Sequence, residues 1–420
     1  MLKLFKRRLR IISVLIVLLG IFLFQSCVEP FETEGIVDNF ESALVIEATI
    51  TNELKQHQIK ITRAFELEAD GARAEPNAIV AVFDDQGAIF QFSEVEPGLY
   101  ESNQIFRAEG TRNYRLSITT SDGRNYSSDP AQLTQETQIE SVNAARITDD
   151  DGNEGMAILV NSFDPSNNSN LYRYEYEETF LIIAPEWADT DLVKSVPNEP
   201  QNCEVDLVFT GENNERICYG TNLSNTIILT NTNGLDEDRV SGLQVRFIDR
   251  DDFILSHRYS ILVRQFVQSP AAHTFYVRLQ ELSQSDDLFS QTQTGLLVGN
   301  VFSEDNENEI VLGYFEVSSV SEERIFFNYG DFFPGEDLPP YAIECTRLAP
   351  DFEVFSEFGL FAGCLLSELV ANGSIEYVGP NEGEIIPDGG LPVGPHIVVP
   401  APCGDCTQLG SNIRPSFWVD

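Results

Sequence analysis

The stretch that decides the fold covers residues 78–92 and reads AIVAVFDDQGAIFQF. Two short runs rich in β-branched and aromatic residues, 78–83 and 88–92, lie on either side of Asp85-Gln86-Gly87. Asp and Gly are residues that tight turns favour, and apolar runs of this length are typical of strands. The stretch therefore predicts two strands separated by a turn.

Similar runs continue in both directions along the chain, at residues 43–50, 58–65 and 114–119. Several of them alternate between apolar and polar residues, as half-buried strands do. Turn sequences such as Pro97-Gly98 and Ser121-Asp122-Gly123 separate them. Strands about ten residues apart, with no helical period, indicate a β-sandwich of the immunoglobulin or fibronectin type. We predict this sandwich over residues 41–135.

A second, larger β domain is predicted over residues 136–330, with strands that include 156–163, 171–184 and 258–267. Within LYRYEYEETFLIIA (171–184), three tyrosines recur at every second position and share one face of the strand: Tyr172, Tyr174 and Tyr176. A sheet face covered by other residues explains this pattern better than an aromatic binding face does.

One segment of this domain has the period of a helix. Ser269 can cap a helix that begins at Pro270, because proline is well suited to the first helical position. Five apolar residues then fall on one face: Ala272, Phe275, Tyr276, Leu279 and Leu282. We predict one amphipathic helix near 270–284. Residues 331–420 are rich in Cys, Pro and Gly and predict an irregular region with disulfides. The fold class is therefore mainly β.

The charge balance excludes some partners. The chain has 26 Lys and Arg residues against 67 Asp and Glu, which gives a net charge of −41. Without the five basic residues of positions 1–10, the balance is 21 − 67 = −46. Such a chain is repelled by nucleic acid and by anionic lipid surfaces. A hydrophobic content of 42% with 29 Phe is enough to fill a sizeable core.

The N-terminus has the pattern of an export signal. Residues 1–10 are basic, residues 11–24 form an apolar run, and Ser26 precedes Cys27. A Cys in this place resembles the lipid-attachment site of bacterial lipoproteins. We predict a signal peptide at 1–26, a lipidated Cys27 and a tether over 27–40. The alternative is a transmembrane anchor, but the apolar run is short for the roughly 20 residues that a span requires.

Six further cysteines remain, an even number that favours disulfides in an exported chain: Cys203, Cys218, Cys345, Cys364, Cys403 and Cys406. Six cysteines allow 15 connectivities. We predict bonds between near neighbours, Cys203–Cys218, Cys345–Cys364 and Cys403–Cys406. The last pair also fits half of a zinc site or a redox pair, but no second Cys or His pair supplies four zinc ligands.

No catalytic motif is present, and we predict no enzyme activity, no cofactor and no metal site. The four histidines are isolated in sequence: His57, His257, His273 and His396. A hydrolase triad assembled in space remains an alternative, since such triads come together only in the fold. The acidic segments 149–154 and 304–309 invite a calcium interpretation, but solvated turns explain them more simply.

Several short segments, taken in their order along the chain, resemble a family. They are LVIE at 44–47, GNVF at 299–302, VLGYF at 311–315 and the ending CGDC … RPSFW at 403–418. The chain resembles Bacteroidota outer-membrane lipoproteins of unknown function (domain of unknown function forty-two forty-nine). The resemblance implies an outer-membrane location and TonB-dependent receptors as neighbours. It implies no catalytic residue.

We therefore expect a lipid-anchored, non-enzymatic protein of the outer membrane that faces the cell exterior and assists a TonB-dependent β-barrel receptor. Phe332 and Phe333, between a Gly and a Pro, are predicted to lie exposed in a loop and to contact the receptor. A structural or adhesive surface lipoprotein without a transporter is the alternative. Neither interpretation names a ligand.

Overall fold

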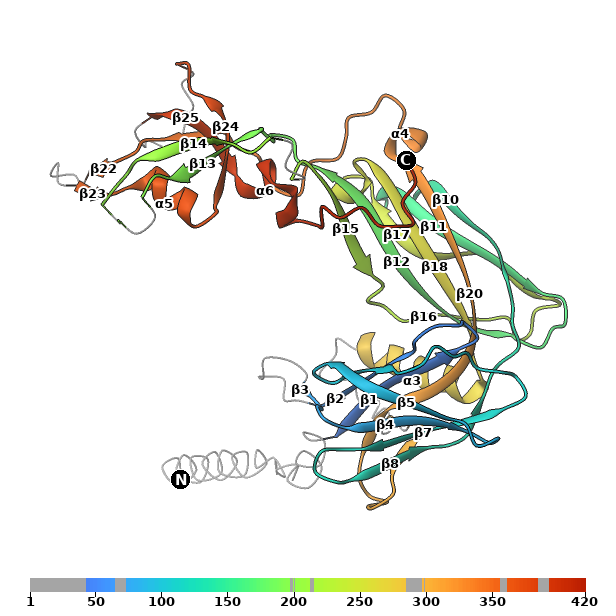
Figure 1. Ribbon diagram of the computed structural model, residues 1–420. Helices are drawn as coiled ribbons and strands as arrows, with labels where there is room; N and C mark the ends of the chain where they lie inside the picture. Colours follow the sequence, from blue (N-terminus) through green and yellow to red (C-terminus); the bar gives the residue numbers. More distant parts are fainter. Residues whose placement is uncertain are drawn as a thin grey trace, which may run out of the picture.

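The structure is a computed structural model that describes residues 43–64, 73–196, 199, 201–211, 215–284, 297, 299–355, 361–383 and 393–420. The predicted signal peptide (1–26), Cys27 and the tether (27–40) lie outside these residues. The chain folds into three lobes arranged along a crescent (Figure 1). We call them, in their order along the crescent, the N-terminal, central and C-terminal lobes. The fold is mainly β, with few helices, as predicted.

The N-terminal lobe surrounds a single apolar core built from alternating strand residues. Antiparallel neighbours pair in the order β1-β2-β6-β5-β4-β7-β8-β19. The predicted stretch 78–92 supplies β4 and β5, which pair around the Asp85-Gln86-Gly87 turn. The strands are β1 (Leu44–Thr51), β2 (Gln58–Arg63), β3 (Arg73–Ala74), β4 (Ile79–Asp84), β5 (Ile89–Glu96), β6 (Leu99–Ser102), β7 (Asn113–Thr119), β8 (Asn125–Ser128), β9 (Ala131–Gln132) and β19 (Val301–Ser303).

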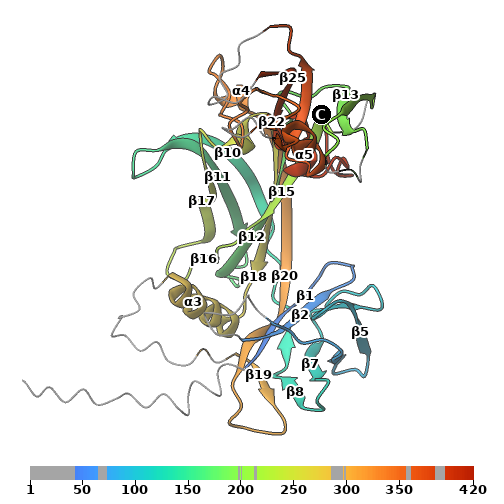
Figure 2. The same cartoon turned by 90° about the vertical axis from the view of Figure 1, so that its left-hand side faces the viewer.

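One long strand, β20 (Val311–Asn328), belongs to two lobes at once. Its first half runs parallel to β1, from Val311 opposite Leu44 to Ser318 opposite Thr51. Its second half pairs antiparallel with β18 of the central lobe. With a rise of about 3.3 Å per residue, its 18 residues make a strand roughly 60 Å long. Figure 2 shows this strand running through both lobes. The lobes therefore share a strand, although residues 41–135 and 136–330 were predicted as two separate domains.

The central lobe is a sandwich of two sheets. One sheet holds β10 (Ile139–Thr148), β11 (Glu154–Asp164) and β17 (Asp238–Asp249), and the other holds β15 (Ile217–Leu223), β16 (Ile228–Asn231), β12 (Leu171–Ile183), β18 (Arg258–Val267) and β20. Tyr172, Tyr174 and Tyr176 are all buried between the sheets, so the covered sheet face is confirmed. A short 3-10 helix, η1 (Phe253–Leu255), leads into β18.

The predicted amphipathic helix is present as α3 (Pro270–Gln284). The Ala272 amide donates to the Ser269 hydroxyl at 3.2 Å, which is the expected cap. Ala272 and Phe275 are buried and Tyr276 and Leu279 are half-buried, so most of the predicted face packs inward, but Leu282 at its end is 37% exposed. The helix lies where the central lobe meets the N-terminal lobe (Figure 2).

The C-terminal lobe is assembled from two excursions out of the central sandwich. Ile183 and Ile217 pair at the end of β12 and β15, so residues 184–216 leave the sandwich and return. They form a hairpin that packs with the residues that follow β20 around a small core. Its elements are β13 (Thr190–Lys194), β14 (Val205–Phe209), β21 (Leu348–Pro350), β22 (Val354–Phe355), β23 (Phe361–Gly363), α5 (Leu365–Ala371), β24 (Ile375–Pro380), β25 (Val393–Pro400) and α6 (Ala401–Gly404).

These elements correct two predictions. Residues 331–420 were expected to be irregular, but they contain a three-stranded sheet, β21-β25-β24, and helices. The predicted lobe boundaries were contiguous, whereas each lobe takes residues from separated parts of the chain. The chain then returns to the central lobe through η2 (Cys406–Gln408), and Ser411 bridges to Tyr219 on β15.

All six cysteines form disulfides, but the predicted near-neighbour pairing is wrong. The bonds are Cys203–Cys364, Cys218–Cys406 and Cys345–Cys403. The hairpin excursion explains the error, because Cys203 leaves with the hairpin while Cys218 stays on β15 of the sandwich. Cys403 and Cys406 therefore bond to different partners, which excludes the CGDC segment as a zinc or redox pair in this state.

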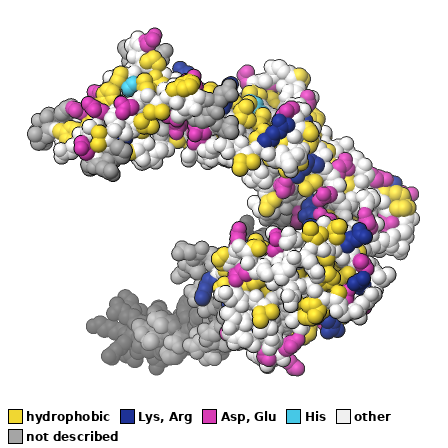
Figure 3. All heavy atoms as spheres, in the orientation of Figure 1, with side chains coloured by type: hydrophobic (Ala, Val, Ile, Leu, Met, Phe, Trp, Pro, Cys, Tyr) yellow, Lys and Arg dark blue, Asp and Glu magenta, His cyan; other side chains and the backbone are white. Residues whose placement is uncertain are grey.

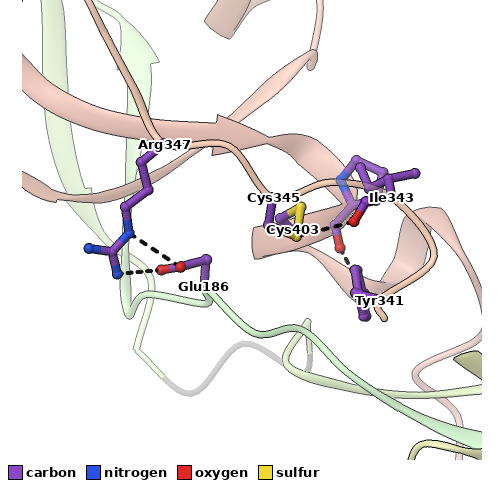
Figure 4. Close-up of a disulfide and its surroundings, with 7 residues drawn as sticks. Glu186, Tyr341, Ile343, Cys345, Arg347 and Cys403 are labelled. Carbon is purple, nitrogen blue, oxygen red and sulfur yellow. Dashed lines mark hydrogen bonds and ion pairs between the residues drawn. A yellow bond between two sulfur atoms is a disulfide. The ribbon is translucent and has the colours of Figure 1, made fainter. Parts of the chain in front are cut away.

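Figure 4 shows contacts of Glu186 that join the two excursions beside one of these bonds. Cys345–Cys403 lies beside Glu186, whose carboxylate accepts two hydrogen bonds from Arg347 at 3.2 and 2.8 Å. The Glu186 amide donates to the Cys403 carbonyl at 3.0 Å. A bidentate ion pair and a disulfide together fix the base of the C-terminal lobe.

Candidate functional site

A cavity of about 860 Å³ lies where the two sandwiches and α3 meet. The segment 129–135 forms one wall, the first half of β20 forms another, and the start of α3 forms the third. Cavities at lobe junctions are common ligand sites. We call this space the junction cavity.

A buried ion-pair network lies beneath the junction cavity. Arg173, on β12, donates to Glu316 on β20 at 3.2 Å and also to Glu175. The Arg173 guanidinium lies over the rings of Phe266 and Tyr276, at 4.4 and 4.7 Å from their centroids. Only 7% of the Arg173 side chain and 2% of the Glu316 side chain are exposed. The two opposite charges compensate each other, so neither is left unpaired under the cavity.

Polar groups around this pair are also engaged. Gln268 donates to Glu316 at 3.4 Å, and its carbonyl oxygen lies 3.0 Å from the His273 ring. Asn300 contacts β20 through its side chain, accepting from the Phe315 amide and donating to the Phe315 carbonyl, both at 2.8 Å. The cavity is therefore preformed. Its described lining offers a space for binding but brings no nucleophile and base together.

A second surface feature lies in the C-terminal lobe, on the hairpin β13–β14. Leu192 is buried against the lobe core, but four large apolar side chains of the same hairpin are exposed: Val193 (40%), Leu207 (51%), Val208 (41%) and Phe209 (73%). We call this hairpin the apolar ribbon. VDLVF (205–209) was not among the predicted strands, although its β-branched and aromatic residues are typical of a strand.

A cluster of carboxyl groups, which we call the acidic cluster, lies next to the apolar ribbon. Glu376 on β24 is half-buried near Asp191, Asp405 and Glu215. Burial is the main cause that raises the pKa of Glu376 to about 7, and the three carboxylates add to it. Burial and Asp405 raise the pKa of Asp191 as well. Neighbouring like charges in a half-buried place favour the protonated carboxyl group. The acidic cluster therefore keeps protons at a pH at which an isolated carboxyl group would have lost them.

The pH dependence of stability should reveal this carboxyl group. The pKa of Glu376 is higher in the folded chain than the ordinary 4.5. The stability that goes with the protonated carboxyl group is therefore fully present below about pH 4.5 and is lost as the pH rises through about 7. At pH 8, Glu376→Gln should therefore raise the free energy of unfolding by up to about 3 kcal/mol. Thermal melts of both proteins at pH 4.5 and 8 measure this, with the exposed Glu204→Gln as control. Equal melting shifts at both pH values would contradict it.

The predicted docking residues Phe332 and Phe333 are not exposed, and this prediction is wrong. Phe333 is 1% exposed, stacks on Tyr329 at 4.6 Å between ring centroids and lies under the Arg146 guanidinium at 4.3 Å. Phe332 packs edge-on against Phe327 at 5.4 Å. Phe332 ends α4 (Tyr329–Phe332) and Phe333 caps it, and this short helix turns both back onto the central core. A network of Arg146, Glu154, Arg250 and Glu336 covers them, an arrangement that local sequence cannot reveal.

The four histidines lie far apart in the fold. The His57 ring is 3.1 Å from the Phe106 carbonyl, and the His273 ring contacts Gln268. His396 contacts the rings of Phe352 and Tyr377, and His257 lines a cavity at the other end of the central lobe. Burial lowers the pKa of all four. Within the described ranges, no histidine ring nitrogen is hydrogen-bonded to a Ser, Asp or Glu side chain.

The two acidic segments serve local structure. Asp149 accepts from the amides of Asp151 and Asn153 at 3.0 and 2.7 Å, which closes a turn. Glu309 accepts from Arg124 and Tyr126 and joins the β19–β20 loop to β8. No group of three or more potential metal ligands is found among the described residues. In the same part of the chain, no helix is long and apolar enough to cross a membrane.

Comparisons with known proteins give one clear match. Residues 28–324 match the family model described as "Domain of unknown function (DUF4249)", which covers the N-terminal lobe and most of the central lobe. The search of curated proteins finds no match. A crystal structure of a DUF4785 family protein from Legionella pneumophila is similar over 52% of this chain and 51% of its own, with 10% identity and a TM-score of 0.16. The chain thus spans about half of that structure, and a likeness this weak carries no argument.

Proposed function

Because the chain belongs to the DUF4249 family, whose description names no activity, we propose its function from its own features: it is a lipid-anchored outer-membrane protein that assists a TonB-dependent receptor without catalysis. It would face the cell exterior, anchored through Cys27, and contact the receptor with its C-terminal lobe. The predicted export signal and the Cys that follows it, at residues 1–27, support the location.

The apolar ribbon is the observation that carries the proposed role. A soluble domain normally exposes large apolar side chains singly, and a group of them marks a contact surface. Here Leu207 and Phe209 are exposed side by side on one face of the hairpin, and Val193 and Val208 are exposed on the other. The disulfide Cys203–Cys364 holds that hairpin to the rest of its lobe, so the surface is preorganised for a partner.

The shared strand β20 supports the same role. The described chain begins at residue 43 in the N-terminal lobe, the lobe next to the proposed anchor, while the apolar ribbon lies in the lobe at the opposite end of the crescent (Figure 1). A continuous strand of 18 residues joins the first two lobes. A partner bound at the ribbon would therefore lie at the far end of the crescent from the N-terminal lobe.

Purification from detergent-solubilised outer membrane tests this proposal. The wild-type chain should co-purify with a TonB-dependent receptor. Cys27→Ser should remain as uncleaved precursor and lose that partner, because lipid attachment precedes cleavage in lipoproteins. Ser13→Ala, which leaves Cys27 and the basic segment unchanged, is the matched control.

Two results would contradict the proposal. If Cys27→Ser fractionates with the outer membrane at the mass of the processed protein, the anchor is wrong. If the wild type co-purifies with no TonB-dependent protein, the accessory role is wrong, and an adhesive or structural role becomes the better explanation.

A further inference from the structure

Among the described residues, the backbone groups on the outer edge of β14 have no strand partner. Ser195 donates to the Glu204 carbonyl at 3.1 Å, and Thr210 donates to the Asp189 carbonyl at 3.0 Å. Between these two bonded pairs, the antiparallel register places Leu192 opposite Leu207. Bonded and non-bonded pairs alternate in such a ladder, so the amide and carbonyl groups of Val205, Leu207 and Phe209 point away from β13.

No strand of the described chain pairs with that edge, since β13 and β14 form a sheet of two strands. Proteins usually protect an exposed edge with Lys, Pro or a bulge. Val205–Phe209 reads VDLVF and contains no Lys, Pro or bulge, and its one charged residue is Asp206. Leu207 and Phe209, which carry outward backbone groups, also expose 51% and 73% of their side chains. The edge thus offers hydrogen bonds and apolar contact to the same partner.

The charges around the edge restrict the kind of partner. Asp189, Glu204 and Asp206 are exposed on the apolar ribbon, and Lys194 is its one basic residue within β13 and β14. The acidic cluster, formed by Asp191, Glu376, Asp405 and Glu215, lies next to the apolar ribbon. A second copy of this edge would bring the same carboxylates together, which opposes pairing between two copies.

We propose that β14 accepts an extended segment of a partner protein as an added strand, and that this segment alternates apolar residues and is flanked by Lys or Arg. Main-chain hydrogen bonds to Val205, Leu207 and Phe209 would supply the affinity, and the apolar side chains and flanking charges the selectivity. This proposal deepens the proposed function. It rests on that function only for the place where the partner would be encountered, the outer membrane.

A synthetic peptide tests the edge without any receptor. The probe alternates Val and Thr over five residues, carries two Lys at each end and has a fluorescent label. Anisotropy measured with the full processed chain should show saturable binding that weakens at high salt, because the attraction between charges is screened. Replacing the lysines by glutamates, or N-methylating the amides of one edge of the peptide, should weaken binding about tenfold or more.

Leu207→Pro is the decisive variant. The amide N–H that proline removes points away from β13. The hydrogen bonds between β13 and β14 therefore remain, and the variant should fold. Leu207→Pro should weaken peptide binding about tenfold or more with little change in melting temperature, since an outward main-chain hydrogen bond and room for the added strand are lost. Leu223→Ser, at an exposed apolar residue of β15, is the matched control and should bind like the wild type.

Amide hydrogen exchange provides a second measurement, which does not depend on the variant. Peptide binding to the wild type should slow exchange at Val205, Leu207 and Phe209. Three results would overturn the proposal: no binding of the lysine peptide at millimolar concentration, full binding by a folded Leu207→Pro chain, or protection elsewhere than β14. Pairing of two copies through β14, seen as a dimer in sedimentation, would also overturn it. Peptide binding without receptor co-purification would contradict the proposed function alone.

Discussion

Replacing both Cys218 and Cys406 by serine is expected to lower the free energy of unfolding by about 5 kcal/mol in the chain-entropy account of disulfides. The bond joins residues 188 positions apart, so its loss frees a very long loop in the unfolded chain. It also fixes the returning segment 405–420 against β15. We expect this to be the largest effect of any disulfide removal.

Denaturant unfolding followed by tryptophan fluorescence measures the effect. The chain has two tryptophans, and Trp418 packs against Tyr219 at 5.0 Å, next to Cys218. Trp418 therefore reports directly on release of the returning segment. The matched control replaces Cys345 and Cys403, which are 58 positions apart and should cost about 1 kcal/mol less. A serine pair that unfolds at the denaturant concentration of the wild type would refute this account.

Glu316→Ala should destabilise the chain by about 3–5 kcal/mol, because it leaves the buried Arg173 guanidinium without its buried partner. The two side chains lie at the floor of the junction cavity, where β12 and β20 meet α3. Glu175 remains as a partner of Arg173, but it is 45% exposed and compensates less. Calorimetry or urea unfolding gives the magnitude.

Two further variants separate the buried pair from general effects. Glu175→Ala removes the exposed carboxylate and should cost less than about 1 kcal/mol. Changing Arg173 and Glu316 together to methionine removes both buried charges and should recover much of the stability lost in Glu316→Ala. If Glu316→Ala costs no more than Glu175→Ala, the Arg173–Glu316 pair does not stabilise the junction.

Local features of the fold could be predicted well from the sequence. The helix at Pro270–Gln284 begins at the predicted proline and shows the predicted buried face, because cap and period are properties of neighbouring residues. The hairpin at residues 78–92 and the strand at 171–184 were predictable for the same reason.

Features that depend on distant residues could not be predicted in this way. The partner of Cys218 is Cys406, because a hairpin excursion separates Cys218 from Cys203. Phe333 is buried because Arg146 from β10 and Arg250, which directly follows β17, cover it. The apolar ribbon likewise depends on which strand edges remain unpaired, and a single strand sequence does not contain that information.

The strand that two lobes share has a consequence for the order of folding. Strand β1 is among the first parts of the chain to be made, yet its parallel partner is β20, where Leu44 lies opposite Val311. Contacts between residues so far apart in sequence form slowly, because a long loop must close first. During synthesis or export that starts at the N-terminus, the first sandwich must therefore wait, incomplete, until the strands of the second have emerged.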